Sequence, residues 1–402
     1  MSGNSDQNRR ISVQLGEPDS TRAAVIVGDN ELSNMTRQAA IDYGVHLDVI
    51  DTRSVSPASS QTAGYCSTRP DVADLGQKRV LTFATDQISG YQMRDFELGS
   101  DIMRPGPHAL NFSRDLLYLR EALCSLGDLS IATPKFSTAT SATDVDIFAQ
   151  QHGWPVVLKS RWTENDNRKV QIIMSRRAAD RFLGSNRWPT VAFETRNQRG
   201  YWLVEEFIEP ANEFVVLIAR RRSGYWISYP PIEIGRQGGI AFETSMPANL
   251  PERVVEEATQ LGASLLSGID ATGIAALRFL WTTDKRLLLD QISLRPHIFG
   301  NLTLEGCQTS QFHQHIRAIF DWPLGSSTLR NSAAALQLIG KPENENFHGN
   351  LASVMSIPNT FLHLYSCQWQ IGQPFGHVSA LGVTADEALS RVREAAIRLC
   401  ES

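Results

Sequence analysis

The sequence is poor in cysteine and lacks the spacings that cysteine-based sites use. Its five cysteines are odd in number and include no Cys-x-x-Cys pair. Disulfide frameworks and structural zinc sites depend on paired or closely spaced cysteines. The cysteine pattern therefore argues against both kinds of site, and we expect a protein of the reducing cytoplasm.

Long apolar runs and an excess of positive charge are also missing. The longest apolar runs, such as 214–219, fall far short of the ~20 residues that a membrane helix needs. The polar stretch 1–20 predicts a disordered arm and no secretory signal. With 38 basic and 43 acidic residues, the net charge is −5, which argues against a protein that neutralises nucleic-acid phosphates. We expect neither a membrane nor a nucleic acid as partner.

The order of apolar segments indicates an α/β protein. An apolar run, a helical stretch and a second apolar run follow one another near the start, which is typical of an open parallel sheet. At roughly 150 residues per domain, 402 residues predict two to three domains. The expected strands are 23–27, 45–50, 79–84, 155–159, 201–207, 214–220, 225–229 and a hairpin of 273–281 with 286–292. The expected helices are 31–43, 109–126, 250–266, 308–320 and 385–399.

A few charged residues stand at the ends or centres of these strands. Lys159 ends a predicted strand, where a lysine can hold a phosphate as a point charge, although a solvated lysine is the more common case. Glu205, Glu206 and Glu213 lie on neighbouring predicted strands. They could contact a ribose or an adenine edge, or they could be exposed strand carboxylates.

The most distinctive segment is the run from Asp290 to Cys307, which reads DQISLRPHIFGNLTLEGC. It resembles the corresponding segment of the N5-carboxyaminoimidazole ribonucleotide synthase family, the ATP-dependent carboxylating enzymes of purine biosynthesis. Ordered matches extend the resemblance over most of the chain. They are Arg-Pro-Gly-Pro at 104–107, Gly-Trp-Pro-Val-Val-Leu-Lys at 153–159, Val-Glu-Glu-Phe at 204–207, Pro-Leu-Gly-Ser at 323–326, His-Leu-Tyr at 363–365 and Gly-His-Val at 376–378.

The resemblance implies an ATP-grasp fold of the α/β class in three parts. These are an N-terminal open parallel-sheet domain over 21–105, an ATP-grasp region over 106–322 and a small β-rich C-terminal domain over 323–402. It also implies a homodimer, since members of the family pair through their N-terminal and central domains. The implied reaction joins bicarbonate to aminoimidazole ribonucleotide, with carboxyphosphate made from ATP.

The same resemblance assigns expected roles to individual residues. Arg295 and His297 match the turn that faces the substrate, and Arg295 is the candidate catalytic residue. Segment 305–312 is expected to serve domain packing. The positions that match nucleotide-binding residues are Arg120, which replaces the family's first ATP lysine, and Lys159, Glu205, Glu206 and Glu213.

The sequence departs from the family where the metal and the phosphates should be held. Arg278 and Gln291 replace the two metal-binding glutamates, so no metal ligand is expected. The family's glycine-rich loop corresponds to 163–169, which has no glycine and cannot be assumed to approach a phosphate closely. Cys367 and the pair at 373–374, Gln-Pro, replace basic residues that grip the substrate's phosphate.

These departures favour a divergent family member with impaired or absent synthase activity. ATP or another nucleotide remains a candidate ligand, whereas bound Mg²⁺ is not expected. The alternatives are a functional synthase that uses unfamiliar residues and a ligase that acts on another substrate. Strand alternation predicts that Asp290 faces away from Gln291. Arg278 is expected to pair with phosphate oxygens or, alternatively, to form a salt bridge with Glu213 or another strand carboxylate and block the pocket.

Overall fold

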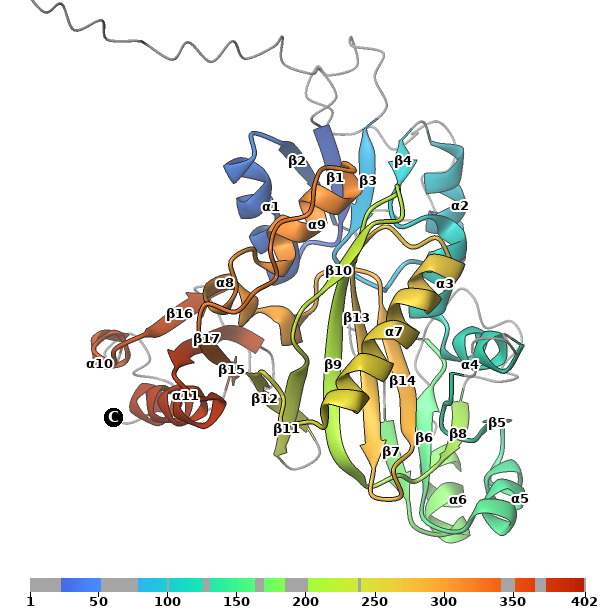
Figure 1. Cartoon of the computed structure of the whole chain (residues 1–402). Coiled ribbons are helices and arrows are strands. Elements are labelled where there is room, and N and C mark those ends of the chain that lie inside the picture. Colours follow the sequence, from blue (N-terminus) through green and yellow to red (C-terminus); the bar gives the residue numbers. More distant parts are fainter. Residues whose placement is uncertain are drawn as a thin grey trace, which may run out of the picture.

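The computed structural model (Figure 1) describes residues 23–51, 79–99, 101–125, 131–162, 170–184, 202–237, 240–340, 351–365 and 374–400. The predicted arm at 1–20, the loop at 163–169, Cys367 and Gln373 lie outside these residues. Within them, the α/β class predicted from the sequence is confirmed, with one parallel sheet and two sheets built of antiparallel pairs.

The N-terminal part is a four-stranded parallel sheet with strand order β2-β1-β3-β4. The predicted succession of strand, helix and strand is present. Asn30 ends the first turn and accepts backbone hydrogen bonds from Leu32 and Ser33, which fixes the start of the first helix. The elements are β1 (Ala23–Val27), α1 (Glu31–Asp42), β2 (His46–Ile50), β3 (Val80–Phe83), α2 (Gly90–Leu98) and β4 (Ile102–Met103).

The helix predicted over 109–126 is two helices, α3 (Pro107–Arg114) and α4 (Leu116–Ser125). Asp115 lies between them in an extended conformation, and its Oδ1 accepts hydrogen bonds from the N–H groups of Leu117 and Tyr118, at 3.0 and 3.2 Å. Its other carboxylate oxygen pairs with Arg161 at 2.6 Å. An aspartate that caps the next helix ends the previous one, which the apolar periodicity alone did not reveal.

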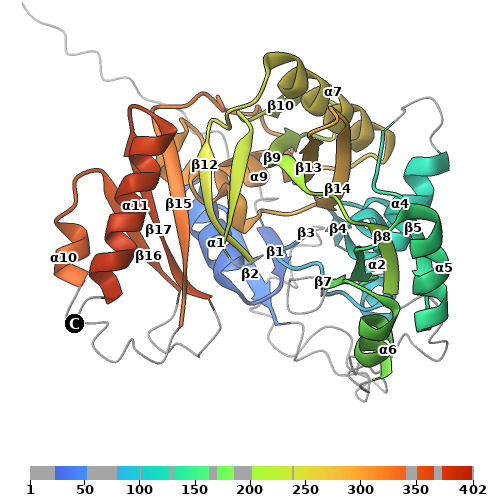
Figure 2. The ribbon, with the colours of Figure 1, turned by 90° about the horizontal axis from the view of Figure 1, so that it is seen from below.

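A second, antiparallel sheet has the order β5-β8-β6-β7 and is covered on one face by two helices. Along β6, Val156 and Leu158 are buried against those helices, so the alternating Lys159 lies on the opposite face. This face looks toward the large sheet (Figure 2). The elements are β5 (Phe136–Ala139), α5 (Ala142–His152), β6 (Val156–Ser160), β7 (Val170–Ile173), α6 (Arg176–Gly184) and β8 (Trp202–Glu206).

The large sheet runs β14-β13-β9-β11-β12-β15-β17-β16, with β10 paired to β9. The predicted hairpin of 273–281 with 286–292 is confirmed as β13 and β14. The C-terminal strands continue this sheet through the β12–β15 pair. The strands are β9 (Pro210–Arg220), β10 (Trp226–Ser228), β11 (Ile232–Gln237), β12 (Ile240–Met246), β13 (Gly273–Thr282), β14 (Leu287–Ser293), β15 (Ser332–Ile339), β16 (Thr360–Leu364) and β17 (Pro374–Gly382).

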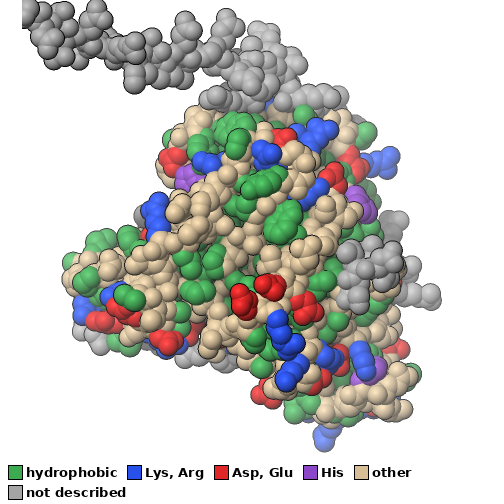
Figure 3. Space-filling view, viewed as in Figure 1, with side chains coloured by type: hydrophobic (Ala, Val, Ile, Leu, Met, Phe, Trp, Pro, Cys, Tyr) green, Lys and Arg blue, Asp and Glu red, His purple; other side chains and the backbone are tan. Residues whose placement is uncertain are grey.

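Helices cover the large sheet and extend its core. The sequence of α7 places its apolar residues against the faces of β9 and β13, and α11 packs on the C-terminal strands (Figure 2). On the face shown in Figure 3, acidic and basic side chains lie in small groups of both signs. The remaining elements are α7 (Glu252–Gly268), η4 (Ile298–Gly300), α8 (Thr303–Gly306), α9 (Gln311–Ile319), α10 (Leu351–Met355) and α11 (Ala385–Cys400).

Helix α9 joins the N-terminal sheet to the large sheet. Phe312, Ile316 and Ile319 share one apolar core with residues of β1, and the fully buried His315 lies among them. The Nδ1 atom of His315 accepts a hydrogen bond from the N–H of Ile274 (3.2 Å), so its proton sits on Nε2 and is donated to Thr82 Oγ1 (2.8 Å). Of the segment 305–312, Phe312 thus has the packing role expected for it.

No helix within the described stretches combines the length and the apolar character that crossing a bilayer requires.

Candidate functional site

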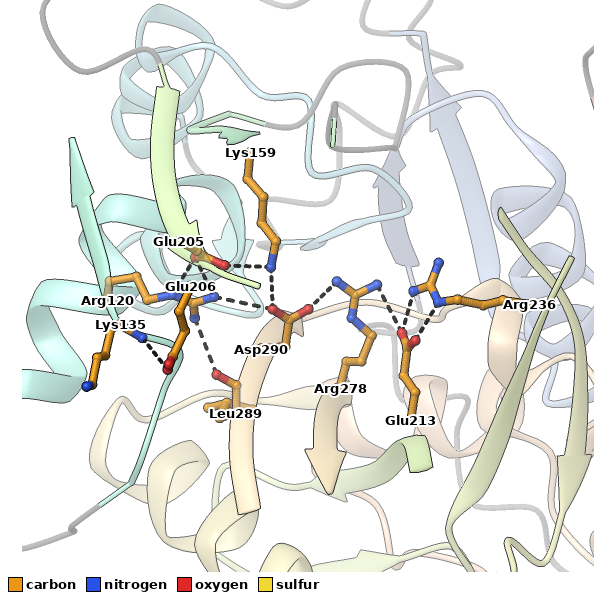
Figure 4. Close-up of polar contacts among 10 residues, drawn as sticks. All are labelled: Arg120, Lys135, Lys159, Glu205, Glu206, Glu213, Arg236, Arg278, Leu289 and Asp290. Atoms are coloured by element: carbon orange, nitrogen blue, oxygen red, sulfur yellow. Dashed lines mark hydrogen bonds and ion pairs between the residues drawn. The ribbon is translucent and has the colours of Figure 1, made fainter. Parts of the chain in front are cut away.

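Charged side chains from both antiparallel sheets meet where the sheets face one another (Figure 4). They come from α4, β6 and β8 on one side and from β9, β11, β13 and β14 on the other. We call this set the ion network. Its members are Arg120, Lys159, Glu205, Glu213, Arg236, Arg278 and Asp290.

Asp290 lies at the centre of the ion network. Its carboxylate pairs with the ammonium of Lys159 at 2.6 Å, with the guanidinium of Arg120 at 3.4 Å and with that of Arg278. Burial opposes ionisation of this carboxyl group, but Arg278, Lys159 and Arg120 outweigh burial and hold the pKa of Asp290 well below its ordinary value. Asp290 is therefore a buried anion whose three neighbours are all cations.

The prediction that strand alternation turns Asp290 away from the site is wrong. In the β13–β14 pair, Arg278 lies opposite Gln291 and the next residue, Phe279, lies opposite Leu289. Asp290 is thus the extra residue of a β-bulge. A bulge breaks the alternation of side chains and redirects them, which brings the Asp290 carboxylate onto the face of β14 that meets the small sheet. We call the region between these two facing sheets, where the ion network lies, the cleft.

Three of the predicted nucleotide-binding residues meet on the small-sheet side of the ion network. Arg120, which has no exposed surface, donates from Nε to Glu205 at 2.9 Å and from Nη1 to the backbone oxygen of Leu289 at 3.3 Å. Glu205 also pairs with Lys159 at 2.7 Å. The structure therefore places these residues together, and Glu205 and Asp290 jointly balance the two cations.

Arg278 occupies the other side of the ion network. Its guanidinium lies between Asp290 and Glu213, at 3.6 Å from the latter, and Arg236 donates to both carboxylate oxygens of Glu213. Burial alone would lower the pKa of Arg278, but Asp290 and Glu213 raise it above its ordinary value. The expected alternative of a salt bridge between Arg278 and a strand carboxylate is confirmed.

The site does not fit a magnesium ion. Mg²⁺ needs carboxylate oxygens that are free to coordinate it, and here the carboxylates nearest to Arg278, those of Asp290 and Glu213, already hold guanidinium or ammonium groups. Gln291 faces Arg278 across the strand pair and offers a neutral amide. Among the residues that the structure describes, no group of three or more histidine, cysteine or acidic side chains is arranged to hold a metal ion.

Glu206 lies outside the ion network. Its carboxylate accepts a hydrogen bond from the backbone N–H of Lys135 at 3.0 Å and lies 3.5 Å from Arg286. It therefore bridges the small sheet to the segment before β5 and to the β13–β14 turn. The nucleotide contact expected for Glu206 stays a prediction.

Arg295 and His297 lie on the turn after β14 and are both engaged within the protein. Arg295 donates to Asp86 at 2.9 Å and to the oxygen of Pro296 at 3.1 Å. His297 Nδ1 accepts from the N–H of Phe299 at 3.3 Å. Burial, with the nearby Arg295 and Arg278, holds the pKa of His297 well below its ordinary value, so the imidazole is neutral. Their roles toward a substrate stay predictions.

Two members of the ion network were missed by the sequence analysis as site residues. Asp290 was predicted on the wrong face of β14 because a β-bulge cannot be recognised from the alternation of apolar and polar residues. Arg236 lies on β11, a strand that was not predicted. The alternation Ile232-Glu233-Ile234 before it was the available signal for that strand.

The fold and this cleft define an ATP-grasp protein, since residues 125–312 match the ATP-grasp domain family. The chain is 29% identical over 384 residues to the N5-carboxyaminoimidazole ribonucleotide synthase of Mycobacterium tuberculosis, covering 92% of this chain and 86% of that relative. The enzyme of that name from Synechococcus elongatus is 27% identical over 384 residues, with 94% and 93% covered. The resemblance predicted from the sequence is confirmed: over more than nine-tenths of its length, the chain is similar to N5-carboxyaminoimidazole ribonucleotide synthases.

Solved structures show the same fold. The crystal structure of carboxyaminoimidazole ribonucleotide synthase from Aspergillus clavatus complexed with ATP has a TM-score of 0.78 at 21% identity and covers 94% of this chain and 98% of its own. The N5-carboxyaminoimidazole ribonucleotide synthetase of Thermotoga maritima has a TM-score of 0.73 at 25% identity, with 93% and 98% covered. The predicted ATP-grasp fold is confirmed.

Proposed function

We propose that this chain is a member of the synthase family that keeps the ATP-grasp scaffold but does not catalyse Mg²⁺-dependent carboxylation of aminoimidazole ribonucleotide. The observation that carries the proposal is the guanidinium of Arg278, held between Asp290 and Glu213. By family resemblance this position belongs to a metal-binding glutamate, and an internal cation stands there instead.

The magnitude of the charge change supports this reading. Two unit charges 4 Å apart interact by about 4 kcal/mol at an effective dielectric of 20, and Mg²⁺ carries two charges. Replacing a carboxylate by Arg278 therefore turns several kcal/mol of attraction into repulsion, before screening by solvent. Phosphoryl transfer needs the charge on the transferred group to be neutralised, and in this class of reaction metal ions supply most of that effect.

The direct test is turnover. Purified chain is incubated with aminoimidazole ribonucleotide, ATP, bicarbonate and Mg²⁺, and phosphate release is measured against a synthase of the family as positive control. We expect release no faster than in a reaction without protein. In cells, we expect no rescue of purine-independent growth in a strain that lacks the synthase, at low bicarbonate. Substrate-dependent release near ordinary enzyme rates of about 1 s⁻¹ would refute the proposal.

A charge-restoring variant tests the cause. In Arg278→Glu with Gln291→Glu, the position regains two carboxylates, and we expect Mg²⁺ to stabilise the folded chain against heat by a concentration-dependent shift. The matched control is Arg176→Glu, an exposed arginine of α6 that pairs with Asp146, because α6 covers the face of the small sheet opposite to Lys159. If Mg²⁺ raised the melting temperature of the control equally, or did not raise that of the double variant, Arg278 would not be the residue that prevents Mg²⁺ binding.

One observation favours a second candidate, a working synthase with unfamiliar ligands. The bulge brings Asp290 to one side of Arg278, with Glu213 on the other side. Movement of Arg278, Lys159 and Arg236 away from these two carboxylates would free oxygens for Mg²⁺. This candidate predicts that Asp290→Asn abolishes Mg²⁺-dependent phosphate release, whereas the main proposal predicts no release to abolish.

We also propose that the chain acts as a homodimer in the cytoplasm, divided into the domains 21–105, 106–322 and 323–402. The support is the resemblance to the synthase family and, for the compartment, the small number of cysteines. Light scattering at micromolar protein is expected to give twice the chain mass of 44.6 kDa. A monomeric mass under those conditions would contradict the dimer.

A further inference from the structure

The small sheet and its two helices form a unit that is joined to the rest of the protein at one end. This small-sheet unit comprises β5, α5, β6, β7, α6 and β8, and it has an apolar core of its own. The chain enters it at the start of β5 and leaves it at the end of β8. These two connections lie side by side, because Phe136 pairs with Glu205 and the N–H of Glu206 donates to the oxygen of Lys135 at 3.0 Å. A unit held by two neighbouring strands can swing about that end.

Few apolar side chains attach the small-sheet unit to the large sheet. Among the described residues of the unit, Leu203 is buried in the apolar core of the large sheet, and Phe136, beside the connections, packs against that core. Other apolar residues of the unit, such as Val156 and Val204, belong to its own core with α5 and α6. The end of the unit away from the connections is thus attached mainly through polar groups.

Two ion pairs attach that far end. Strand β6 begins beside the connections and ends away from them, so Lys159 and Arg161 lie toward the far end. Lys159 pairs with Asp290 of β14 at 2.6 Å. Arg161 pairs with Asp115, between α3 and α4, at 2.6 Å, and its backbone oxygen accepts from the N–H of Leu116 at 2.9 Å. Both pairs therefore cross from the unit to elements that pack on the large sheet.

Asp290 separates cations that belong to the two parts of the protein. In Figure 4 its carboxylate lies between Lys159 of the small-sheet unit and Arg278 of the large sheet, and it also pairs with Arg120 of α4. Glu205 pairs with Arg120 as well, but next to the connections. Without the charge of Asp290, Lys159 would face two guanidinium groups, and like charges repel. The bulge that turns Asp290 toward the unit thus joins the two parts.

We infer that the small-sheet unit is a lid that the chain holds closed without any ligand, through the pairs of Lys159 with Asp290 and of Arg161 with Asp115. The closed lid covers the cleft, so a ligand enters only after both pairs have opened. The pairs are an autoinhibitory contact made by side chains of this chain alone. The inference does not rest on the proposed function, because it concerns the ligand-free protein and holds whether or not the cleft has catalytic activity.

Amide hydrogen exchange at single-residue resolution measures opening of the lid in the ligand-free full chain. The N–H of Leu116 reports opening, because its hydrogen bond to Arg161 crosses from α4 to the lid. The amides of the β6–β8 ladder inside the lid, and of the β9–β13 ladder inside the large sheet, report unfolding. A lid that opens as a rigid body exposes the N–H of Leu116 and leaves both ladders protected.

Variants assign the closed state to the ion pair. Asp290→Asn is expected to speed exchange of the Leu116 N–H by about tenfold, while both ladders change by less than about twofold. Lys159→Gln acts from the lid side and is expected to speed it less, because it leaves no facing cations. In the double variant the rate is expected to fall back toward that of Lys159→Gln. The matched control is Arg176→Gln, whose pair with Asp146 lies within the lid, and no change is expected.

Three results would overturn the inference. The first is an unchanged Leu116 exchange rate in both Lys159→Gln and Asp290→Asn, and the second is an equal acceleration in Arg176→Gln. The third is acceleration of the β6–β8 ladder together with Leu116, since that would show unfolding of the unit and not opening of a lid. If Asp290→Asn does not fold, Lys159→Gln alone decides. Mg²⁺-dependent turnover would overturn the proposed function and would leave this inference standing.

Discussion

The cleft and the interface around His315 both bury polar groups, but they do so by opposite means. The cleft gathers seven charged side chains that compensate one another. The interface surrounds a single neutral imidazole with apolar side chains of α9 and the N-terminal sheet, and burial lowers the pKa of His315 to about 3. In the cleft, burial is tolerated because the charges are paired. At the interface, it is tolerated because His315 carries no charge.

This difference determines how each region tolerates change. In the cleft, removing one charged side chain leaves its partners buried and under-compensated, so Arg278 is stable at its position only because the carboxylates of Asp290 and Glu213 receive it. At the interface, the backbone N–H of Ile274 and the hydroxyl of Thr82 fix one tautomer of His315. Substitutions there alter packing and hydrogen bonding with no effect on the charge of the cleft.

The largest loss of folding stability is expected when Arg120, the most buried cation of the cleft, is removed. Arg120→Met leaves Glu205 buried beside a single remaining cation, Lys159, and weakens the charge compensation of Asp290. Breaking a buried ion pair from one side costs about 3–5 kcal/mol, so urea unfolding is expected to show a loss of that size.

The control for Arg120 distinguishes charge from packing. Arg120→Met combined with Glu205→Gln also removes the anion that Arg120 compensated, so the double variant is expected to recover part of the loss. The exposed Arg176→Met is expected to change stability by less than about 0.5 kcal/mol. A loss below about 1 kcal/mol in Arg120→Met itself would show that the ion network does not hold the two sheets together.

The second-largest loss of folding stability is expected at acid pH, where His315 of the interface disfavours the folded chain. The folded pKa of His315 is about 3, below the ordinary 6.5, so between these values the unfolded chain binds a proton that the folded chain does not. Stability therefore falls as pH drops below 6.5, by about 2 kcal/mol at pH 5 from this group alone. Urea unfolding at pH 7 and pH 5 measures it.

Two variants assign the acid effect to His315. His315→Gln is expected to reduce the difference between pH 7 and pH 5, whereas His46→Gln, at an exposed position of β2, is expected to leave it unchanged. The buried His297 and His377 also have lowered pKa values and contribute in the same direction, so part of the acid effect persists. An unchanged difference in His315→Gln would contradict this account.

Sequence reasoning succeeded where a signal is local or where an ordered set of motifs exists. The strand–helix–strand start, the β13–β14 hairpin and the ATP-grasp fold were all predictable. It failed at Asp115 and Asp290 for a physical reason. The cap at Asp115 is made with the N–H groups of Leu117 and Tyr118, and apolar periodicity does not register such a polar side-chain bond. The bulge at Asp290 is set by the pairing of β14 with β13, and the residue pattern of one strand carries no information about that pairing.

The smallest loss of folding stability is expected when the hydrogen bond between Thr82 and His315 is removed. Thr82→Val keeps the shape of the side chain but removes the oxygen that accepts the proton of His315 Nε2 at 2.8 Å. A buried donor left without an acceptor costs about 1–3 kcal/mol, and we expect about 1 kcal/mol because the ring can shift. The matched control is Thr36→Val, since among the described residues the Thr36 hydroxyl bonds to Leu32 of its own helix alone, and a smaller loss than in Thr82→Val is expected. Equal losses in both variants would mean that the interface depends on packing around His315 and not on its fixed tautomer.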